Sequence, residues 1–360
     1  MKPFFKWSGG KRREAPVVRR FKPPEFDTFY EPFLGGGAIW LNLEHHKNVV
    51  NDSYDDAMNF YRVLKSDPAL LVEEINRLSA AYNMEMADVK RDKEIEKQIK
   101  TAQTERDKLY ASNFKKVTNA VATLKRIKRK HDEEKVDQLI EGFTEWDAAL
   151  KDKSMQIKSL KEKLNEPVYK IANKYYYHYR DTDFDTDFEN AVKFYVLRQL
   201  SFSGMLRFSS DGKFNIPYGW YKTFKGIDQG VEKIQEILGN TTLMCCDWKE
   251  SVSGATEEDF VFLDPPYTRT FTEYHPNGQF GEEQHEELAE WFKTTDAKVM
   301  IILNRDEFTE KLYEGFIVDD YDYKYSVQYR DRMTEKDSNA KHFIAINNYE
   351  VETPGEHNEG

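Results

Sequence analysis

Cysteine is scarce in this chain, and long apolar runs are missing. The two cysteines among the 360 residues, Cys245 and Cys246, are adjacent. Neighbouring thiols cannot supply the ligand set of a zinc site, and a disulfide between them would be strained. We therefore expect reduced thiols in an ordinary strand and a cytoplasmic protein. No stretch of about 18 apolar residues could span a membrane, and charges interrupt the apolar residues near Met1, which argues against a signal peptide.

Histidine spacing and net charge narrow the possible classes further. The eight histidines show neither HExxH nor another paired spacing, so we predict no metal. The formal net charge of −11 disfavours nucleic acid as a partner, but DNA binding needs a local basic surface rather than a basic total. Residues 1–22 hold eight Lys/Arg and one Glu, and residues 115–130 hold seven Lys/Arg and no acid. A solvated helix face is the alternative for the second stretch.

Glycine and proline are absent from Ala69 to Glu141. Apolar residues recur every three or four positions from 136 to 164, and less regularly before that, which is typical of amphipathic or coiled-coil helices. We predict a helical insertion over about 85–165, with two long antiparallel helices, a turn near 131–134 and an end at Pro167. Its role is left open between phosphate contact by the basic stretch and coiled-coil self-association. Polar residues 351–360 are predicted to be a flexible tail.

Apolar segments alternate with helical ones on both sides of this region. Segment 259–267 is a predicted strand that ends in a rigid turn, 297–304 is another predicted strand, and 282–295 is a predicted helix between them. Such alternation is typical of a largely parallel α/β sheet. We therefore expect residues 1–52 and 241–350 to form one sheet that the middle of the chain interrupts.

A glycine-rich turn lies where the first predicted strand, residues 26–33, passes into a helix. It begins with Glu31 and contains Gly35 and Gly37, and glycines let a backbone bend sharply and approach a ligand closely. Asp52 ends the next predicted strand, where an acid can accept both ribose hydroxyls of a nucleoside cofactor. The spacing matches neither GxGxxG nor a Walker loop. S-adenosylmethionine (SAM), a sulfonium without phosphate, suits a turn that begins with an acid, although glycines also serve simple turns.

The tetrapeptide Asp264-Pro265-Pro266-Tyr267 follows an apolar strand. The amino group of adenine is a poor nucleophile because its lone pair is delocalised, so a catalyst must aim hydrogen-bond acceptors at the amino protons. The Asp264 carboxylate and a backbone carbonyl, for which we favour Pro265, can do this, and the prolines hold the carbonyl direction. The Tyr267 ring offers a stacking face for a flipped base. A polyproline turn closed by a surface tyrosine is the alternative.

The segments 5–11, 31–37, 202–219 and 264–267 together resemble motifs of the Dam-type DNA adenine-N6 methyltransferases of class alpha, the D12 family. Residues 5–11 resemble the KWxGGK motif, 31–37 the SAM motif (D/E)PFxGxG, 202–219 the DNA-reading hairpin and 264–267 the catalytic DPPY. The resemblance covers the two α/β parts and residues 190–225, but we do not extend it to 85–165.

The resemblance implies a fold and a cofactor site. The fold would be a Rossmann-like SAM-dependent methyltransferase sheet in 1–52 and 241–350, with a helical target-recognition domain in 53–240 that contains the insertion. The residues expected to hold SAM are Trp7, Lys11, Glu31, Phe33, Gly35, Gly37, Asp52 and Asp264. Asp264 would lie between SAM and the target amino group. Asp247 either contacts the adenine of SAM or merely ends a strand or caps a turn.

The resemblance also implies DNA contacts. These are expected at Phe202, Ser203, Met205, Arg207, Pro217 and Tyr274. Arg207 would enter the major groove and pair with guanine O6 and N7, while Met205 and Pro217 would supply apolar contacts. The family commonly reads GATC, and the hairpin and Arg207 agree with that sequence. Phe202 and Ser203 replace the usual Tyr-Asn, so the recognised sequence is left open.

The sequence thus predicts a site-specific methyltransferase that acts on double-stranded DNA. The methyl group would pass from SAM to N6 of a flipped adenine, without a metal or a covalent intermediate. No cysteine lies in a turn suited to attack a ring carbon, which disfavours cytosine-C5 chemistry. The alternatives are a cytosine-N4 methyltransferase, which needs the same acceptors, a DNA-binding protein of this fold without catalysis, and a methylase of RNA or protein.

Overall fold

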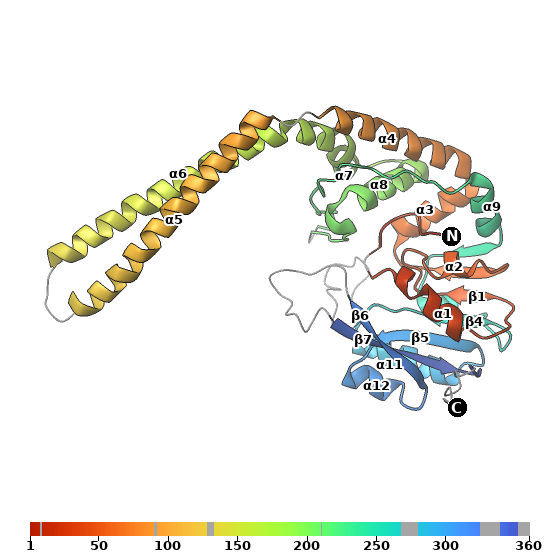
Figure 1. Cartoon of the computed structure of the whole chain (residues 1–360). Helices are drawn as coiled ribbons and strands as arrows, with labels where there is room; N and C mark the ends of the chain where they lie inside the picture. The colour runs from red at the N-terminus through yellow and green to blue at the C-terminus, as the bar shows by residue number, and fades with distance from the viewer. Residues whose placement is uncertain are drawn as a thin grey trace, which may run out of the picture. The chain divides into compact units, whose positions relative to one another are not determined.

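The structure is a computed structural model, and it divides the chain into two compact units (Figure 1). It describes residues 1–7, 9–89, 92–127, 133–209, 211–267, 280–324 and 339–351. The first unit comprises Met1–Asn83 and Tyr175–Gly360, and the second comprises Met84–Lys174. Tyr274 lies outside the described residues, as do residues 352–360 of the tail predicted at 351–360.

The first unit is built on a sheet of seven described strands in the order β3-β2-β1-β4-β5-β7-β6. The strands from β3 to β5 are parallel, whereas β7 runs antiparallel to both β5 and β6. The mixed α/β fold predicted from the alternating segments is thereby confirmed. The strands are β1 (Phe29–Glu31), β2 (Asn48–Asn51), β3 (Thr241–Met244), β4 (Phe260–Leu263), β5 (Lys298–Asn304), β6 (Ile317–Lys324) and β7 (Asn339–Asn347).

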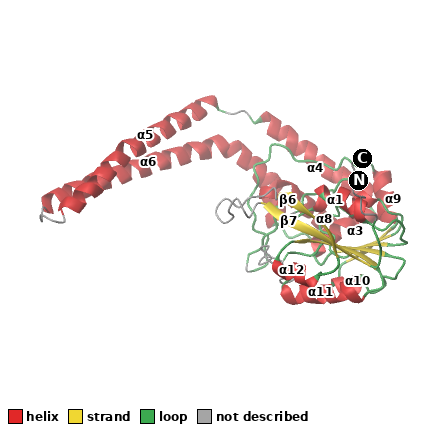
Figure 2. Cartoon of the chain, turned by 60° about the horizontal axis from the view of Figure 1, so that its bottom comes forward, coloured by secondary structure: helices red, strands yellow, loops and turns green. Residues whose placement is uncertain are grey.

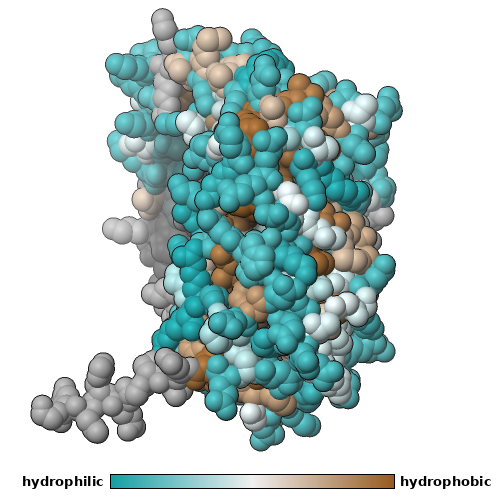
Figure 3. Space-filling model, turned by 90° about the vertical axis from the view of Figure 1, so that its right-hand side faces the viewer, coloured by the Kyte–Doolittle hydropathy of each residue, from teal (hydrophilic) through white to brown (hydrophobic). Residues whose placement is uncertain are grey.

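Helices cover both faces of this sheet, as Figure 2 shows. On one face, Leu288 and Phe292 of α11 pack with Val261 of β4 and Ile301 of β5 in a fully buried core. Strands covered on both sides need nearly continuous apolar residues, which is why all four residues of β4 are buried. Figure 3 draws one side of the molecule. Hydrophilic residues make up most of that surface, with apolar residues between them.

The helices of the described residues range from single turns to α6, which has about eleven turns. They are η1 (Lys11–Arg13), α1 (Ala15–Phe21), α2 (Trp40–Leu43), α3 (Asp55–Ser66), α4 (Pro68–Asp88), α5 (Lys93–Ile127), α6 (Glu133–Ala172), the π-helix η2 (Asn173–Tyr177), α7 (His178–Asp181), α8 (Asp187–Leu200), η3 (Phe202–Gly204), α9 (Val231–Gly239), α10 (Trp248–Ser251), α11 (Glu282–Thr294) and α12 (Glu307–Leu312). None of them is both long and apolar enough to cross a membrane.

The second unit is formed mainly by α5 and α6, which pack along each other (Figure 1). The Trp146 indole donates to the carbonyl of Leu109 (3.1 Å), and Lys153 pairs with Glu105 (2.8 Å). Our prediction that Pro167 ends the second helix is wrong, since α6 continues through it to Ala172. A proline removes one helical hydrogen bond, but Ile171 and Ala172, at the end of the helix, are buried and favour its continuation.

A hairpin follows α8 in the first unit, at the segment whose sequence resembles the DNA-reading hairpin. Isolated bridges join Ser201 to Tyr218 and Phe208 to Phe214. Further in, the backbone N–H of Asn215 donates to the carbonyl of Arg207 (3.0 Å). We call residues 201–219 the recognition hairpin.

Candidate active site

The carboxyl ends of parallel strands place three predicted motifs at one edge of the sheet. The glycine turn follows β1, Asp52 follows β2 and Asp264 follows β4. Because β1 lies between β2 and β4 and is parallel to both, residues distant in sequence meet beside the turn. This edge is where ligands of open α/β sheets bind.

The glycine turn is tied directly to Asp52. The carboxylate accepts a hydrogen bond from the N–H of Gly35 (2.7 Å) and another from the N–H of Tyr54 (2.9 Å). Gly35 and Gly37 have φ of +52° and +65°, a conformation that a side chain would strain. A β-carbon on Gly35 would also lie 2.7 Å from the indole nitrogen of Trp7. The structure therefore brings Trp7, the glycines and Asp52 together, as the resemblance implies.

Glu31 lies at the start of this turn and binds the first residue of α2. It ends β1, is almost fully buried, and accepts a hydrogen bond from the N–H of Trp40 (2.8 Å). Burial raises the pKa of Glu31 well above its ordinary value, although the hydrogen bond from Trp40 opposes the shift. In this structure Glu31 thus anchors the start of α2.

Phe33 and Asp247 both adjoin the start of α10, Phe33 through the Trp248 ring (ring centres 6.3 Å apart) and Asp247 as the residue before it. The half-buried Phe33 ring packs edge to face against Phe280, with ring centres 5.5 Å apart. The exposed Asp247 accepts a hydrogen bond from the N–H of Lys249 (2.9 Å) and caps α10. Capping is one of the two roles that the sequence left open for Asp247, and β3 ends before it at Met244.

Asn51 belongs to the site although the sequence analysis missed it. Its side-chain amide donates to the carbonyl of Pro32 (3.0 Å) and its side-chain oxygen accepts from the N–H of Cys246 (3.0 Å). This buried residue therefore links the segments that follow β1 and β3. The only signal in the sequence is its position beside Asp52 at the end of a strand.

Lys11 contacts the tetrapeptide Asp264–Tyr267 rather than the glycine turn. Its Nζ lies 3.1 Å from Oδ1 of Asp264, and it donates a hydrogen bond to the Tyr267 hydroxyl. Burial raises the pKa of Asp264 to about 6, against the lowering effect of Lys11. Burial alone would lower the pKa of Lys11, but Asp264, Tyr267 and Glu14 raise it well above its usual value. Asp264 is therefore a carboxylate at neutral pH, ready to accept a hydrogen bond.

His285 fixes the backbone of the same tetrapeptide and was also missed. This fully buried residue of α11 places its Nε2 2.9 Å from the carbonyl oxygen of Pro266. Because a carbonyl only accepts, Nε2 carries the hydrogen. Burial also lowers the pKa of His285, which keeps the ring neutral. Within the described residues no hydrogen bond reaches the Pro265 carbonyl, which we favoured as the second acceptor.

Arg198 links α8, the helix that leads into the recognition hairpin, to the segment that holds Trp7. It is a buried residue of α8, three positions before Ser201, and its Nε donates to the carbonyl of Lys6 (2.9 Å). Its guanidinium carbon lies 5.0 Å from the centre of the Trp7 ring. Burial lowers the pKa of Arg198 to about 10, so it stays charged at neutral pH. No motif drew attention to it, because only folding places it beside Trp7.

The recognition hairpin presents a strained and exposed turn. Ser203 and Gly204 have φ of +56° and +60°, and Ser203 is a residue type that seldom adopts this conformation. The preceding Phe202 is 52% exposed. Arg207 is held by Asn215, whose side-chain oxygen accepts from its Nε (2.6 Å). Of the other expected DNA contacts, Met205 is half-buried and Pro217 is exposed.

Comparison with known proteins assigns the family. Residues 7–145 and 137–327 match the model of the D12 class N6 adenine-specific DNA methyltransferases. The chain is 26% identical over 331 residues to the type II methyltransferase M1.LlaDCHI of Lactococcus lactis subsp. cremoris, covering 88% of this chain and 86% of the relative. It is 25% identical over 352 residues to the type II methyltransferase M.CviBI of Paramecium bursaria Chlorella virus NC1A, covering 97% and 100%. It is 22% identical over 324 residues to the DNA adenine methylase of Haemophilus influenzae, covering 87% and 83%.

The fold and the matched motifs define a DNA methyltransferase. More particularly, the chain belongs to the D12 class N6 adenine-specific DNA methyltransferases, so DNA is its substrate. The family match comes in two pieces that overlap at residues 137–145, within the region over which we did not extend the resemblance. Among the described residues, no group of three or more His, Cys, Asp or Glu could hold a metal ion.

Proposed function

We propose that this protein transfers a methyl group from SAM to N6 of an adenine that has been rotated out of duplex DNA. The observation that carries the proposal is the placement of Asp264 beside the glycine turn and Asp52, at the carboxyl edge of one sheet. A donor held by the turn and a base held by the tetrapeptide would meet there.

The residues around the glycine turn fit SAM. Gly35 and Gly37 let the turn pack against Trp7 and Trp40 more closely than a side chain would allow, and Asp52 offers carboxylate oxygens where ribose hydroxyls would lie. The rings of Trp7 and Phe33 supply flat apolar walls. When bound, SAM supplies an electrophilic methyl group on a sulfonium. The turn, Asp52 and the two rings would fix its position.

The catalytic tetrapeptide then acts on the adenine amino group. The Asp264 carboxylate accepts one amino hydrogen and the Pro265 carbonyl accepts the other, which directs the nitrogen lone pair towards the methyl group. His285 holds the next carbonyl, so the direction of the turn is kept. As N6 gains the methyl group it becomes acidic, and Asp264, whose pKa is about 6, can take the proton that leaves. The Tyr267 ring provides the stacking face for the base.

The recognition hairpin would read the neighbouring bases. The exposed Phe202 suits the gap that a flipped base leaves in the duplex, and Arg207 has the fork that guanine O6 and N7 require. We take GATC as the sequence to test first, because Arg207 matches the pattern of the family. The Phe202-Ser203 pair in place of Tyr-Asn makes an altered sequence the second choice.

The decisive experiment combines labelled SAM with product analysis. Methylated DNA digested to nucleosides should contain N6-methyladenine, and N4-methylcytosine in its place would refute the proposal. Binding of DNA without any incorporation would mark a protein that has lost catalysis, and transfer to RNA or protein alone would mark another substrate class. Sequencing modified bases in DNA from cells that express the protein would give the recognised sequence.

A further inference from the structure

A second buried carboxylate lies behind the catalytic residues. Glu14 precedes α1, and its side chain is 2% exposed. Its Oε2 lies 3.4 Å from Nζ of Lys11, the same ammonium that contacts Asp264. Lys11 is thus shared between two carboxylates, of which only Asp264 belongs to the proposed catalytic machinery.

The β6–β7 hairpin holds Glu14 in place. Oε1 of Glu14 accepts hydrogen bonds from Nδ1 of His342 (2.8 Å), on β7, and from the hydroxyl of Tyr321, on β6. His342 is fully buried and is paired with Tyr321 in the strand register. Burial would raise the pKa of Glu14, but His342, then Lys11 and Tyr321, keep it below its ordinary value. Glu14 is therefore a fixed negative charge.

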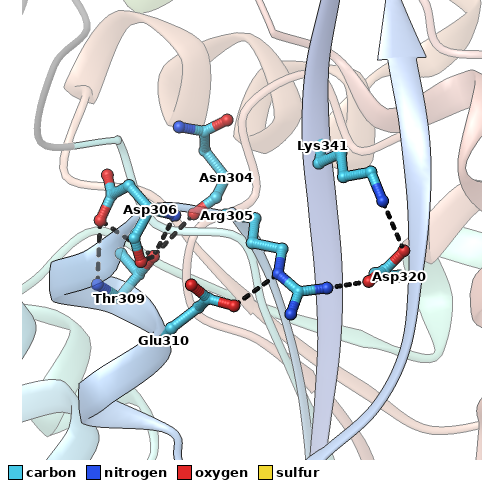
Figure 4. A network of polar contacts seen from close by, with 7 residues as sticks. All are labelled: Asn304, Arg305, Asp306, Thr309, Glu310, Asp320 and Lys341. Atoms are coloured by element: carbon cyan, nitrogen blue, oxygen red, sulfur yellow. Dashed lines mark hydrogen bonds and ion pairs between the residues drawn. The ribbon is translucent and has the colours of Figure 1, made fainter.

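An ionic network anchors this hairpin to the end of β5 (Figure 4). Arg305, directly after β5, pairs with Asp320 of β6 and with Glu310 of α12 (2.5 Å). Asp320 also pairs with Lys341 of β7 (3.4 Å). The position of His342 and Tyr321 is consequently set by several elements of the fold.

We propose that Glu14 is a positioning residue that, held by His342 and Tyr321, draws the Lys11 ammonium partly away from Asp264. This inference rests on the proposed function. An ammonium with Asp264 as its only anionic partner would lie closer to that carboxylate and compete with the adenine amino group for its oxygens. Glu14 divides the attraction, so Asp264 keeps an oxygen free to accept from adenine.

The charged and titratable groups around Glu14 come from four elements. They are Lys11 on η1, Asp264 and Tyr267 after β4, Tyr321 and Tyr323 on β6, and His342 on β7. Among the described residues, Oε2 of Glu14 has no hydrogen-bond donor, so its interaction with Lys11 is one of charge. Removing the charge of Glu14 takes an anion away from Asp264 and brings Lys11 nearer. Both changes lower the pKa of Asp264.

The test is Glu14→Gln, which removes the charge and keeps the shape. We expect kcat to fall about 10-fold with the KM for DNA within about twofold of wild type. In parallel, carbon-13 NMR of aspartate-labelled protein, assigned with Asp264→Asn, should show the Asp264 carboxyl titrating at lower pH. A folded variant with an unchanged kcat, or with an unmoved Asp264 titration, would overturn the proposal.

Two tyrosine variants keep the test valid if Glu14→Gln does not fold. Tyr321→Phe removes one donor to Glu14 and should lower kcat by a smaller factor. Tyr313→Phe is its matched control, because Tyr313 is fully buried in the same sheet's core and its hydroxyl has no partner among the described residues. Equal losses in both variants would count against the proposal. If the wild-type protein methylates no DNA, the proposed function fails, whereas the NMR titration still decides the role of Glu14.

Discussion

The catalytic tetrapeptide and the recognition hairpin hold their functional side chains in opposite ways. Asp264, whose side chain is 19% exposed, lies in an ionic cluster with the buried Lys11, and partial burial raises its pKa to about 6. Phe202 of the hairpin is instead 52% exposed, and the strained Ser203 follows it. Asp264, the proposed acceptor, is thus held in place before DNA arrives, whereas Phe202 is left exposed and Arg207 is tied only to Asn215 of its own hairpin.

This difference has a physical reason. A charge that must act in the transition state gains most from fixed partners in a dry site, because no reorganisation is then needed. A side chain that reads base edges must be free to enter a groove, so it cannot be buried in the free protein. Changes at the tetrapeptide should therefore affect the rate, and changes at the hairpin should affect discrimination.

The largest effect is expected from Asp264→Ala. Loss of the carboxylate acceptor should reduce single-turnover methyl transfer by about 10²–10³-fold or more, while DNA affinity in a binding assay stays close to wild type. Glu257→Ala, at an exposed acid, is the control and should leave both quantities unchanged. Substantial turnover by Asp264→Ala would contradict the acceptor role.

Arg207→Ala tests the hairpin side of the comparison. Discrimination at one base pair should drop by ~1–3 kcal/mol, measured from kcat/KM on a set of duplexes that differ at single positions. The rate on the best duplex at saturation should change far less. A uniform loss across all duplexes, such as we expect from a phosphate contact, would show that Arg207 does not read a base. Lys222→Ala is the control for removal of an exposed charge.

The pH dependence should separate the two regions without a mutation. Asp264 has a raised pKa of about 6 and accepts hydrogen bonds best when it is ionised, so the reaction is supported above pH 6 and lost below it. We expect kcat/KM to fall about tenfold for each pH unit below 6. DNA affinity measured over the same pH range should not show this fall. If kcat/KM instead began to fall only near pH 4, the pKa of Asp264 would not be raised, and its described environment would be wrong.

The smallest effect is expected from the basic stretch 115–130, whose side chains lie outside the described residues. Replacing Lys125, Arg126, Lys128 and Arg129 with glutamine should reduce the salt dependence of DNA binding by roughly 0.9 in slope for each phosphate that the variant no longer neutralises. Base discrimination should stay unchanged. Lys161→Gln with Lys163→Gln, at exposed positions on α6, is the matched control. An unchanged slope together with a concentration-dependent dimer in sedimentation would favour self-association instead.

Local patterns carried the predictions that the structure confirmed. Alternating apolar and helical segments were enough for a mixed α/β sheet, because both periodicities are properties of neighbouring residues. The glycine turn was predictable for the same reason: Gly35 and Gly37 do adopt left-handed φ there. Pro167 shows the limit of such reasoning, since packing after the proline outweighs its local preference to end a helix.

The sequence by itself determined which residues stand at the ends of strands and which turns they form, since these depend on adjacent residues. Tertiary structure alone decided that Lys11 faces Asp264, that Glu14 meets His342 and that Arg198 reaches Lys6. These partners lie far apart in the chain, so their pairing depends on strand order and helix packing. A buried charge takes its pKa from such neighbours and from the exclusion of water, which no local pattern records.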